Sequence, residues 1–185
     1  MTQDKMSVEI AGVTLKNPVI TASGTFGFGR EYSEFYDLSR LGAVCAKGLT
    51  LEPRLGNPPP RIAETPMGIL NSVGLQNPGI HAFIRDEIPF LRKFDTKIIA
   101  NISGNTLDEY VEMGRIIDGA DVDMVELNIS CPNVKAGGMA FGTSCDTVES
   151  LVYAVRDVCR RPLIVKLSPN VTDIAAIARA AQSGG

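Results

Sequence analysis

Five short apolar segments of the chain each end in residues that can bind or react. Every end carries an amide, a hydroxyl or an ammonium group, and the ends are Thr21-Ala22-Ser23-Gly24, Lys47-Gly48, Asn101-Ile102-Ser103-Gly104, Asn128-Ile129-Ser130-Cys131-Pro132-Asn133 and Lys166-Leu167-Ser168-Pro169-Asn170. Wet loops explain the Ser and Asn residues. They explain Lys47 and Lys166 poorly, because lysine is rarely buried without a purpose. The pattern favours a site for a planar, anionic, hydrogen-bonding molecule.

Other kinds of chemistry find little support. The only histidine, His81, follows Pro78-Gly79 in a helical stretch and is expected to be ordinary, which removes most Ser–His and Cys–His schemes. The cluster Gly24–Gly29 does not fit the dinucleotide fingerprint G-x-G-x-x-G, and no Walker A loop occurs. No two of the four cysteines are spaced C-x-x-C, so we expect free thiols and no metal site.

Apolar strands that alternate with amphipathic helices position these ends. The predicted strands are Pro18–Ala22, Gly42–Lys47, Lys97–Ile102, Asp123–Asn128 and Leu163–Leu167. Helices are predicted to start at Thr106, at Thr143 or Ser144, and near Thr172 or Asp173. A hairpin is predicted to precede them, with Val8–Ile10 and Val13–Leu15 as its strands. Repeated strand–helix units imply parallel strands, whose carboxyl ends meet on one face of the domain. The pattern alone fits both an open doubly wound sheet and a (β/α)₈ barrel.

Bulk properties narrow the class further. The chain has 185 residues, enough for one domain, and a net charge of −3, which does not favour a nucleic-acid partner. No apolar run approaches the roughly 18 residues that span a bilayer, and the polar N-terminus lacks the apolar core of a signal peptide, so we expect a cytosolic protein. Residues 48–79 hold six of the eleven prolines, and we expect an ordered excursion over one end of the domain.

Five motifs together resemble those of dihydroorotate dehydrogenases. They are Ala22-Ser23-Gly24-Thr25, Ala46-Lys47-Gly48-Leu49-Thr50, Asn71-Ser72-Val73-Gly74-Leu75-Gln76-Asn77-Pro78-Gly79, Asn128-Ile129-Ser130-Cys131-Pro132-Asn133-Val134 and Val165-Lys166-Leu167-Ser168-Pro169-Asn170. Cysteine at position 131 is typical of class 1, where membrane-associated class 2 enzymes have serine. The following segment, Lys135 to Thr143, is similar to the NAD-linked subclass 1B rather than to fumarate-linked 1A.

The resemblance implies a (β/α)₈ barrel with FMN at its C-terminal face. This chain would supply about five strand–helix units and the N-terminal hairpin, as a single domain over residues 1–185 that stops before strands 6–8, with residues 48–79 over the active-site face. Dihydroorotate would lose a proton from C5 to Cys131 and a hydride from C6 to the flavin.

The same resemblance assigns the contacts of the site. The FMN contacts would be Ser23, Lys47, Gly48, Asn101, Asn128 and Lys166, with Lys166 near the pyrimidine edge of the flavin. The substrate contacts would be Lys47, Asn71, Ser72, Val73, Gly74, Leu75, Asn128 and Asn133. A partner subunit with FAD and a [2Fe–2S] cluster would pass electrons to NAD, in a heterotetramer built on a homodimer.

Two other interpretations stay open. A tRNA-dihydrouridine synthase is a related flavin barrel with a loop cysteine, but it would need a basic RNA surface. The chain could also be an inactive piece of the longer enzyme, because the family holds the FMN phosphate with loops after later strands. Strand parity adds one expectation: Glu126 faces the same side as Asn128, where Lys47, Lys166, a backbone group or water would be its partner.

Overall fold

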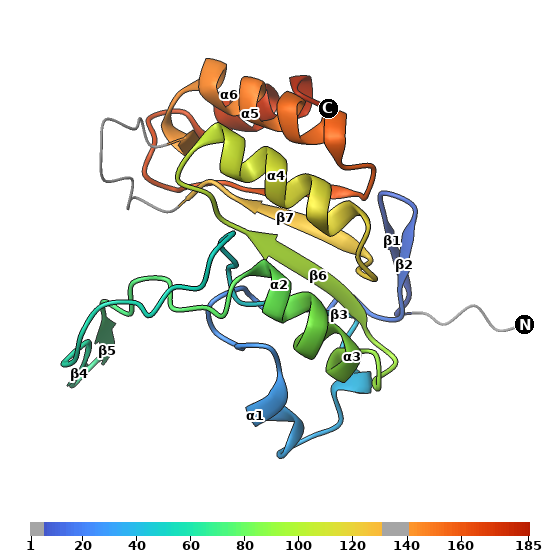
Figure 1. Ribbon diagram of the computed structural model, residues 1–185, viewed down its shortest axis with the longest axis vertical. Helices are drawn as coiled ribbons and strands as arrows, with labels where there is room; N and C mark the ends of the chain where they lie inside the picture. The colour runs from blue at the N-terminus through green and yellow to red at the C-terminus, as the bar shows by residue number, and fades with distance from the viewer. Residues whose placement is uncertain (1–5, 131–140) are drawn as a thin grey trace, which may run out of the picture.

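The centre of the molecule is a parallel sheet of four strands (Figure 1). The computed structural model describes residues 6–130 and 141–185. In spatial order the strands are β3 (Ala43–Cys45), β6 (Lys97–Ile102), β7 (Met124–Asn128) and β8 (Leu163–Lys166). The register sets Asn101 opposite Glu126, and Asn128 opposite Lys166. The predicted α/β class with parallel strands is confirmed.

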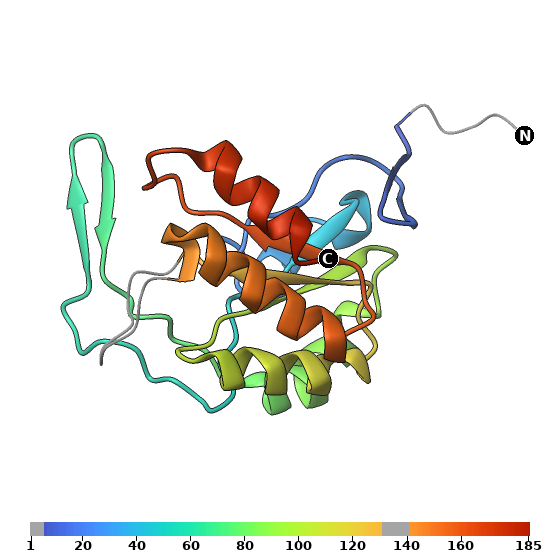
Figure 2. The same ribbon diagram turned by 90° about the horizontal axis from the view of Figure 1, so that it is seen from above.

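Helices cover one face of this sheet. Three of them, α4, α5 and α6, lie side by side (Figure 2). The helices are α2 (Ile80–Ala82), α3 (Ile88–Leu91), α4 (Leu107–Asp118), α5 (Cys145–Val158) and α6 (Ile174–Ser183), with a π turn over Phe83–Glu87 between α2 and α3. Their apolar stripes pack on alternate strand residues such as Ile98, Ala100 and Val125. Each fully buried aliphatic side chain contributes about 1.5–3 kcal/mol.

Two of the three predicted helix starts have a side-chain cap, whereas Ser144 stands at the N-cap position of α5 and its side chain makes no capping hydrogen bond. Thr106 accepts a hydrogen bond from the N–H of Glu109, and Asp173 accepts one from Ala176. The carboxylate of Glu109 accepts from the N–H of Asn105 at 2.6 Å rather than from Thr106, so the reciprocal bond of the capping box is displaced by one residue.

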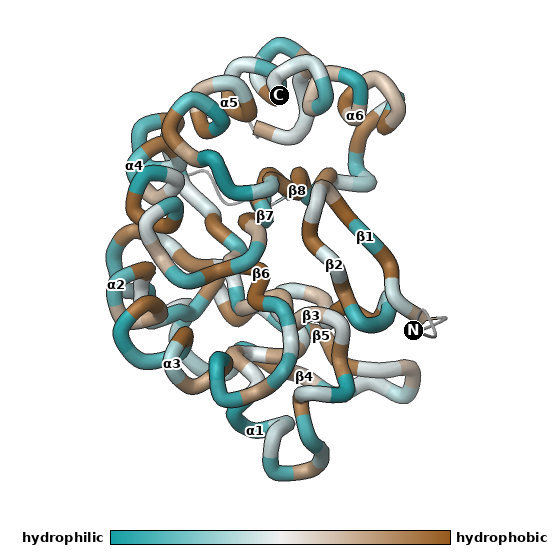
Figure 3. Tube along the Cα trace, turned by 90° about the vertical axis from the view of Figure 1, so that its right-hand side faces the viewer, coloured by the Kyte–Doolittle hydropathy of each residue, from teal (hydrophilic) through white to brown (hydrophobic). Residues whose placement is uncertain are grey.

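The opposite face of the sheet is closed at one end by the predicted hairpin, β1 (Val8–Ile10) and β2 (Val13–Leu15). This hairpin lies beside the sheet near β7 and β8 (Figure 3). Its Leu15 side chain packs against Cys45, Ile99 and Met124 in a separate apolar cluster. The same strand face is therefore apolar near the hairpin and polar at the carboxyl ends.

The predicted strand Pro18–Ala22 is wrong as a strand, because only Ile20 forms a bridge, to Ala43. Proline has no N–H for the ladder. The hydroxyl of Thr21 accepts the N–H of Cys45 at 3.0 Å, where a strand would offer a carbonyl. The segment still lies along β3, since Val19 accepts from the N–H groups of Gly42 and Ala43.

The two edges of the sheet differ. The Val19–Thr21 segment lies along β3. Within the described residues β8 pairs with β7 alone, and its four residues are all half-buried. The chain thus leaves one strand edge of the described sheet unpaired.

Four further elements stand outside the sheet. The short helix α1 (Arg30–Ser33) and a 3₁₀ turn at Leu38–Arg40 precede β3, and another 3₁₀ turn, Phe141–Thr143, precedes α5. The hairpin β4 (Ile62–Thr65) and β5 (Gly68–Asn71) extends away from the body on the side of the strand carboxyl ends (Figures 1 and 2). The sequence did not predict this hairpin.

Candidate functional site

A cavity of about 240 Å³ lies at the carboxyl ends of the strands. Segments that are far apart in the sequence meet there. Its lining residues are Ser23, Gly24, Lys47, Gly48, Asn71, Val73, Gly74, Leu75, Asn128, Ser130 and Lys166. The structure therefore brings together nine of the residues predicted for the site.

Two cationic side chains reach this cavity from neighbouring segments. Lys166 is the last residue of β8, and its Nζ donates to the hydroxyl of Ser23 at 3.5 Å. Lys47 follows β3, and its N–H donates to the carbonyl of Gly27 at 2.9 Å, while Ala46 and Leu49 on either side still donate to β6. Two half-buried ammonium groups beside one small cavity favour an anionic or electron-rich occupant.

A buried amide pair supports the cavity from the strand side. Asn101 is fully buried, and its Nδ2 donates to the carboxylate of Glu126. Its Oδ1 accepts from Asn128 Nδ2 at 3.5 Å, and Asn128 Oδ1 accepts from Ser130 at 2.8 Å. These bonds fix the orientation of both side-chain amides, because a flipped amide would place its oxygen or nitrogen against a group that cannot bond to it.

Glycine at position 48 is required by the space around it. A methyl group there would lie 2.9 Å from Asn101 Oδ1 and 3.0 Å from the Leu75 side chain. Leu75 itself has a φ of 55°, in the left-handed region that non-glycine residues rarely adopt. Strained backbone of this kind occurs at functional sites. Gly48 and Leu75 thus form a tight wall of the cavity.

The loop that carries Asn71 to Leu75 is fastened by one buried amide. Asn77 Oδ1 accepts from the N–H groups of Thr50 (3.1 Å) and Gly79 (2.9 Å). Its Nδ2 donates to the carbonyl of Leu75 at 2.8 Å. The residue is 6% exposed, so these bonds are formed away from water.

Below the cavity the same strand face carries an apolar cluster, here called the apolar floor, which includes the thiol of Cys45. Cys45 is 2% exposed and packs with Ile99 and Met124. Burial, and after it the negative charge of Glu126, raises the pKa of the Cys45 thiol far above its usual value. This thiol is therefore neutral and structural.

Several predicted residues lie elsewhere. Asn101 stands behind Gly48 rather than in the cavity wall. Ser72 lines a different hollow, beside Pro60 and Ile62. Cys131 and Asn133 lie outside the described residues. Sequence analysis missed Gly24 and Ser130, although both belong to the motifs that it singled out.

Glu126 faces the cavity side of the sheet, as its parity predicted. Its hydrogen bonds come from Asn101 and from Ser23, whose hydroxyl donates at 3.0 Å. Lys166 reaches the carboxylate only through Ser23. The expected link between this lysine and Glu126 is thus indirect.

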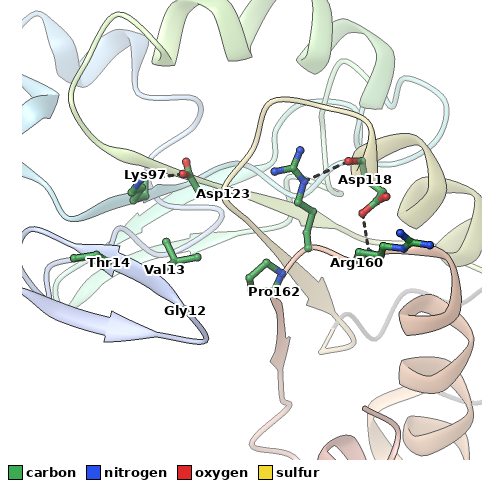
Figure 4. A pocket seen from close by; sticks show the side chains of 9 residues that line it. Gly12, Val13, Thr14, Lys97, Asp118, Asp123, Arg160 and Pro162 are labelled. Carbon is green, nitrogen blue, oxygen red and sulfur yellow. Dashed lines mark hydrogen bonds and ion pairs between the residues drawn. The ribbon is translucent and has the colours of Figure 1, made fainter.

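A larger cavity, of about 710 Å³, lies at the other end of the strands (Figure 4). Its charged side chains have partners within the protein: Lys97 pairs with Asp123 at 3.2 Å, and the carboxylate of Asp118 accepts from the backbone N–H of Arg160. Arg161 donates to backbone carbonyls of Asp118 and Ala120. These bonds join the strand starts to the turns before them, so we assign this cavity a structural role despite its size.

Two kinds of feature are absent from the part of the chain that the structure describes. It contains no group of three His, Cys, Asp or Glu side chains that could hold a metal ion. None of its helices is long and apolar enough to cross a membrane. Cys45, Cys145 and Cys159 are free thiols, as predicted.

Fold and site together define an α/β protein with a polar ligand site at the carboxyl ends of parallel strands, which is where such folds bind ligands. Residues 5–185 match the family model described as dihydroorotate dehydrogenase. The chain belongs to this family, and the resemblance inferred from the five motifs is confirmed.

The relatives sharpen the assignment. The dihydroorotate dehydrogenase B (NAD(+)) catalytic subunit of Alkaliphilus oremlandii is 63% identical over 185 residues, which cover 100% of this chain and 61% of that protein. Its counterpart in Alkaliphilus metalliredigens is 62% identical with the same coverage. The protein of the same name in Geobacillus kaustophilus is 56% identical over 98% of this chain and 58% of its own length. The chain thus spans about three fifths of these relatives.

Proposed function

We propose that this chain forms the cofactor- and substrate-binding part of an FMN enzyme that oxidises (S)-dihydroorotate to orotate in pyrimidine synthesis. The observation that carries the proposal is the single cavity in which Lys47, Lys166, Asn71 and Asn128 converge. Membership of the dihydroorotate dehydrogenase family supports it.

The cavity fits the ring part of such ligands. A volume of about 240 Å³ is below the roughly 300–1,000 Å³ typical of whole small-molecule sites, so it suits planar rings rather than a complete nucleotide. Amide, hydroxyl and ammonium groups line it, which match the carbonyl and nitrogen edges of a flavin and the carboxylate of orotate. Gly48 lines the cavity without a side chain, and a methyl group there would crowd Asn101 and Leu75.

The chain's own residues would divide the work. Ser23, Lys47, Gly48, Asn128 and Lys166 would hold FMN, with Asn101 acting from behind Gly48. Lys47 with Asn71, Val73, Gly74 and Leu75 would orient dihydroorotate, together with Asn128, Asn133 and Ser72.

Cys131 would act as the base that removes the proton from C5, because that proton is only weakly acidic and needs a positioned acceptor. Bound FMN would supply an acceptor for the hydride that leaves C6. The ammonium groups of Lys47 and Lys166 would stabilise the negative charge that develops on the rings.

The sheet would be part of a (β/α)₈ barrel. The parallel order β3-β6-β7-β8, with helices on one face and the site at the carboxyl ends, supports this architecture. The segment Val19–Thr21 along β3 would take the place of the first barrel strand.

Electrons would pass to NAD through a partner subunit that carries FAD and a [2Fe–2S] cluster, on a catalytic homodimer. The names of the relatives support the acceptor and a partner subunit, since they specify NAD(+) and a catalytic subunit. An assay of the full-length enzyme, with and without its partner, tests the acceptor: NAD should be reduced only with the partner. Rapid reoxidation by fumarate would indicate the class 1A alternative.

A cysteine variant tests the chemical step. In the full-length enzyme, Cys131→Ala should keep the flavin absorbance spectrum and lose nearly all reduction of FMN by dihydroorotate under anaerobic conditions. Cys145→Ala, at a half-buried thiol that starts α5, is the matched control and should be reduced normally. Normal reduction of the Cys131 variant would overturn the assignment of the base.

A further inference from the structure

We propose that Glu126 is a positioning residue whose carboxylate fixes the orientation of the amides at the site and offsets the charge of Lys166. The inference rests on the proposed function and deepens it, because it explains how the cavity keeps one arrangement of donors and acceptors. Glu126 does not line the cavity itself.

The place of Glu126 in the sheet brings it under the cavity. It lies on β7 directly opposite Asn101 of β6, and two residues before Asn128 on the same strand face. The two neighbours of Glu126 in β7, Val125 and Leu127, pack with the helices on the other face. A carboxylate on this strand face therefore sits between the polar end and the apolar floor.

Every hydrogen bond of the network points toward this carboxylate. From one side Lys166 Nζ donates to Ser23 Oγ, and Ser23 Oγ donates to Glu126. From the other side Ser130 donates to Asn128 Oδ1, Asn128 Nδ2 donates to Asn101 Oδ1, and Asn101 Nδ2 donates to Glu126. An ionised carboxylate accepts hydrogen bonds and donates none, so it is the terminus of both chains.

This direction determines which way the amides face. Because Glu126 accepts a hydrogen bond from the NH₂ group of Asn101, the amide oxygen of Asn101 must face Asn128. Asn128 must then offer its NH₂ group to Asn101 and its oxygen to Ser130. A neutral group at position 126 that could also donate would permit the opposite orientation of both amides.

The same carboxylate acts on the charge of the site. One hydroxyl, that of Ser23, separates it from the ammonium of Lys166. Below it lie Cys45, Ile99 and Met124, which are all buried and apolar, so the charge is weakly screened on that side. The negative charge therefore lowers the positive potential that Lys166 presents to a bound ring.

Glu126→Gln separates charge from shape, because the amide has the same size and keeps one acceptor oxygen. In the flavin-loaded full-length enzyme, we expect the midpoint potential of the flavin to move to a more positive value, since a negative charge beside Lys166 is lost. Glu126→Asp keeps the charge but shortens the reach to Ser23 and Asn101. It should leave the potential near the wild-type value and raise the KM for dihydroorotate on the order of tenfold, as expected for one lost charged hydrogen bond.

Glu109→Gln is the matched control. Its carboxylate also accepts two hydrogen bonds, from the N–H and side chain of Asn105, but at the start of α4. It should change neither potential nor KM. If Glu126→Gln does not fold by circular dichroism, Glu126→Met takes its place, because it also removes the negative charge beside Lys166 and should shift the potential in the same direction.

The outcomes are distinct. A wild-type enzyme without flavin, or one that dihydroorotate does not reduce, overturns the proposed function and this inference with it. A functional wild type whose potential is unchanged in Glu126→Gln, or in Glu126→Met where that variant stands in, overturns the inference alone. A potential that shifts as much in Glu126→Asp as in Glu126→Gln shows that charge is not the cause, and also overturns it.

Discussion

The side-chain amide of Asn77 donates to the hydroxyl of Thr50 at 3.0 Å, and this buried contact joins the two ends of the loop that carries one wall of the cavity. The same amide binds the backbone of Gly79 and Leu75. Together with the backbone pairing of Arg54 and Asn77, this side chain anchors the long loop, and its own bonds are formed where water does not compete.

Asn77→Ala should lower the free energy of unfolding by about 1–3 kcal/mol, because the N–H of Thr50 would lose its partner in a buried position. Urea denaturation measures the change. Asn57→Ala removes an exposed amide from the same loop, with one bond to Ser72, and should cost much less. Equal losses in the two variants would contradict the role of burial.

Gly48→Ala should weaken flavin binding strongly while the protein stays folded. The added methyl group would meet Asn101 Oδ1 at 2.9 Å and Leu75 at 3.0 Å, so one wall of the cavity must move. Flavin fluorescence after gel filtration of the full-length enzyme measures retention. Gly119→Ala is the control, because a methyl group there meets nothing closer than 3.8 Å. Full retention in Gly48→Ala would show that this wall is not tight.

Asp123 should make part of the stability depend on pH. Burial alone would raise the pKa of this carboxyl, but the N–H of Ile98 and the cations Arg92 and Lys97 together hold the pKa below its usual value. A lowered pKa in the folded state means that the stabilisation is present above the unfolded pKa of about 3.9 and is lost as pH falls through the lower folded value.

Urea titrations between about pH 3 and pH 7 test this, since the unfolding free energy of Asp123→Asn should fall less toward acid than that of the wild type. Asp121→Asn is the control. Asp121 also binds Arg92, but its side chain is 73% exposed, whereas that of Asp123 is 15% exposed. A steep acid loss that persists in Asp123→Asn would refute the assignment.

Cys45 should resist alkylation in the folded protein. Burial and the neighbouring charge of Glu126 raise the pKa of its thiol, and the thiolate is the reactive form. Iodoacetamide at pH 8 followed by mass spectrometry of peptides should label Cys145, which is half-buried, before Cys45 and Cys159, which are buried. Labelling of Cys45 at the rate of Cys145 would contradict the described floor. In urea all of these thiols should react.

The strands and helices of the sheet could be predicted because their apolar patterns are strong and local. Lys97–Ile102 matches β6 at both ends, and the caps Thr106 and Asp173 mark the starts of α4 and α6. The absence of a regular strand at Pro18–Ala22 could not be predicted. It depends on the hydroxyl of Thr21, which accepts a hydrogen bond from the N–H of Cys45, a residue distant in the sequence. The hairpin β4–β5 is almost wholly exposed, so it has no alternation of buried and exposed residues to detect.

The site divides in the same way. Residues at strand ends could be predicted as a group, since parallel strands bring their carboxyl ends together. The direction of the network around Glu126 could not, because it depends on side chains from positions 23 and 101, and no local pattern relates them. Parity showed which side Glu126 faces, but not that Ser23 stands between it and Lys166.

The open side of β8 has a consequence for handling the protein in the laboratory. Leu163 to Lys166 offer a row of backbone donors and acceptors next to half-buried apolar side chains, with no strand partner among the described residues. Such edges recruit strands from other molecules. A preparation of these 185 residues alone should therefore form concentration-dependent aggregates, with Lys166, at the end of the edge, as the one charge on this strand that opposes them.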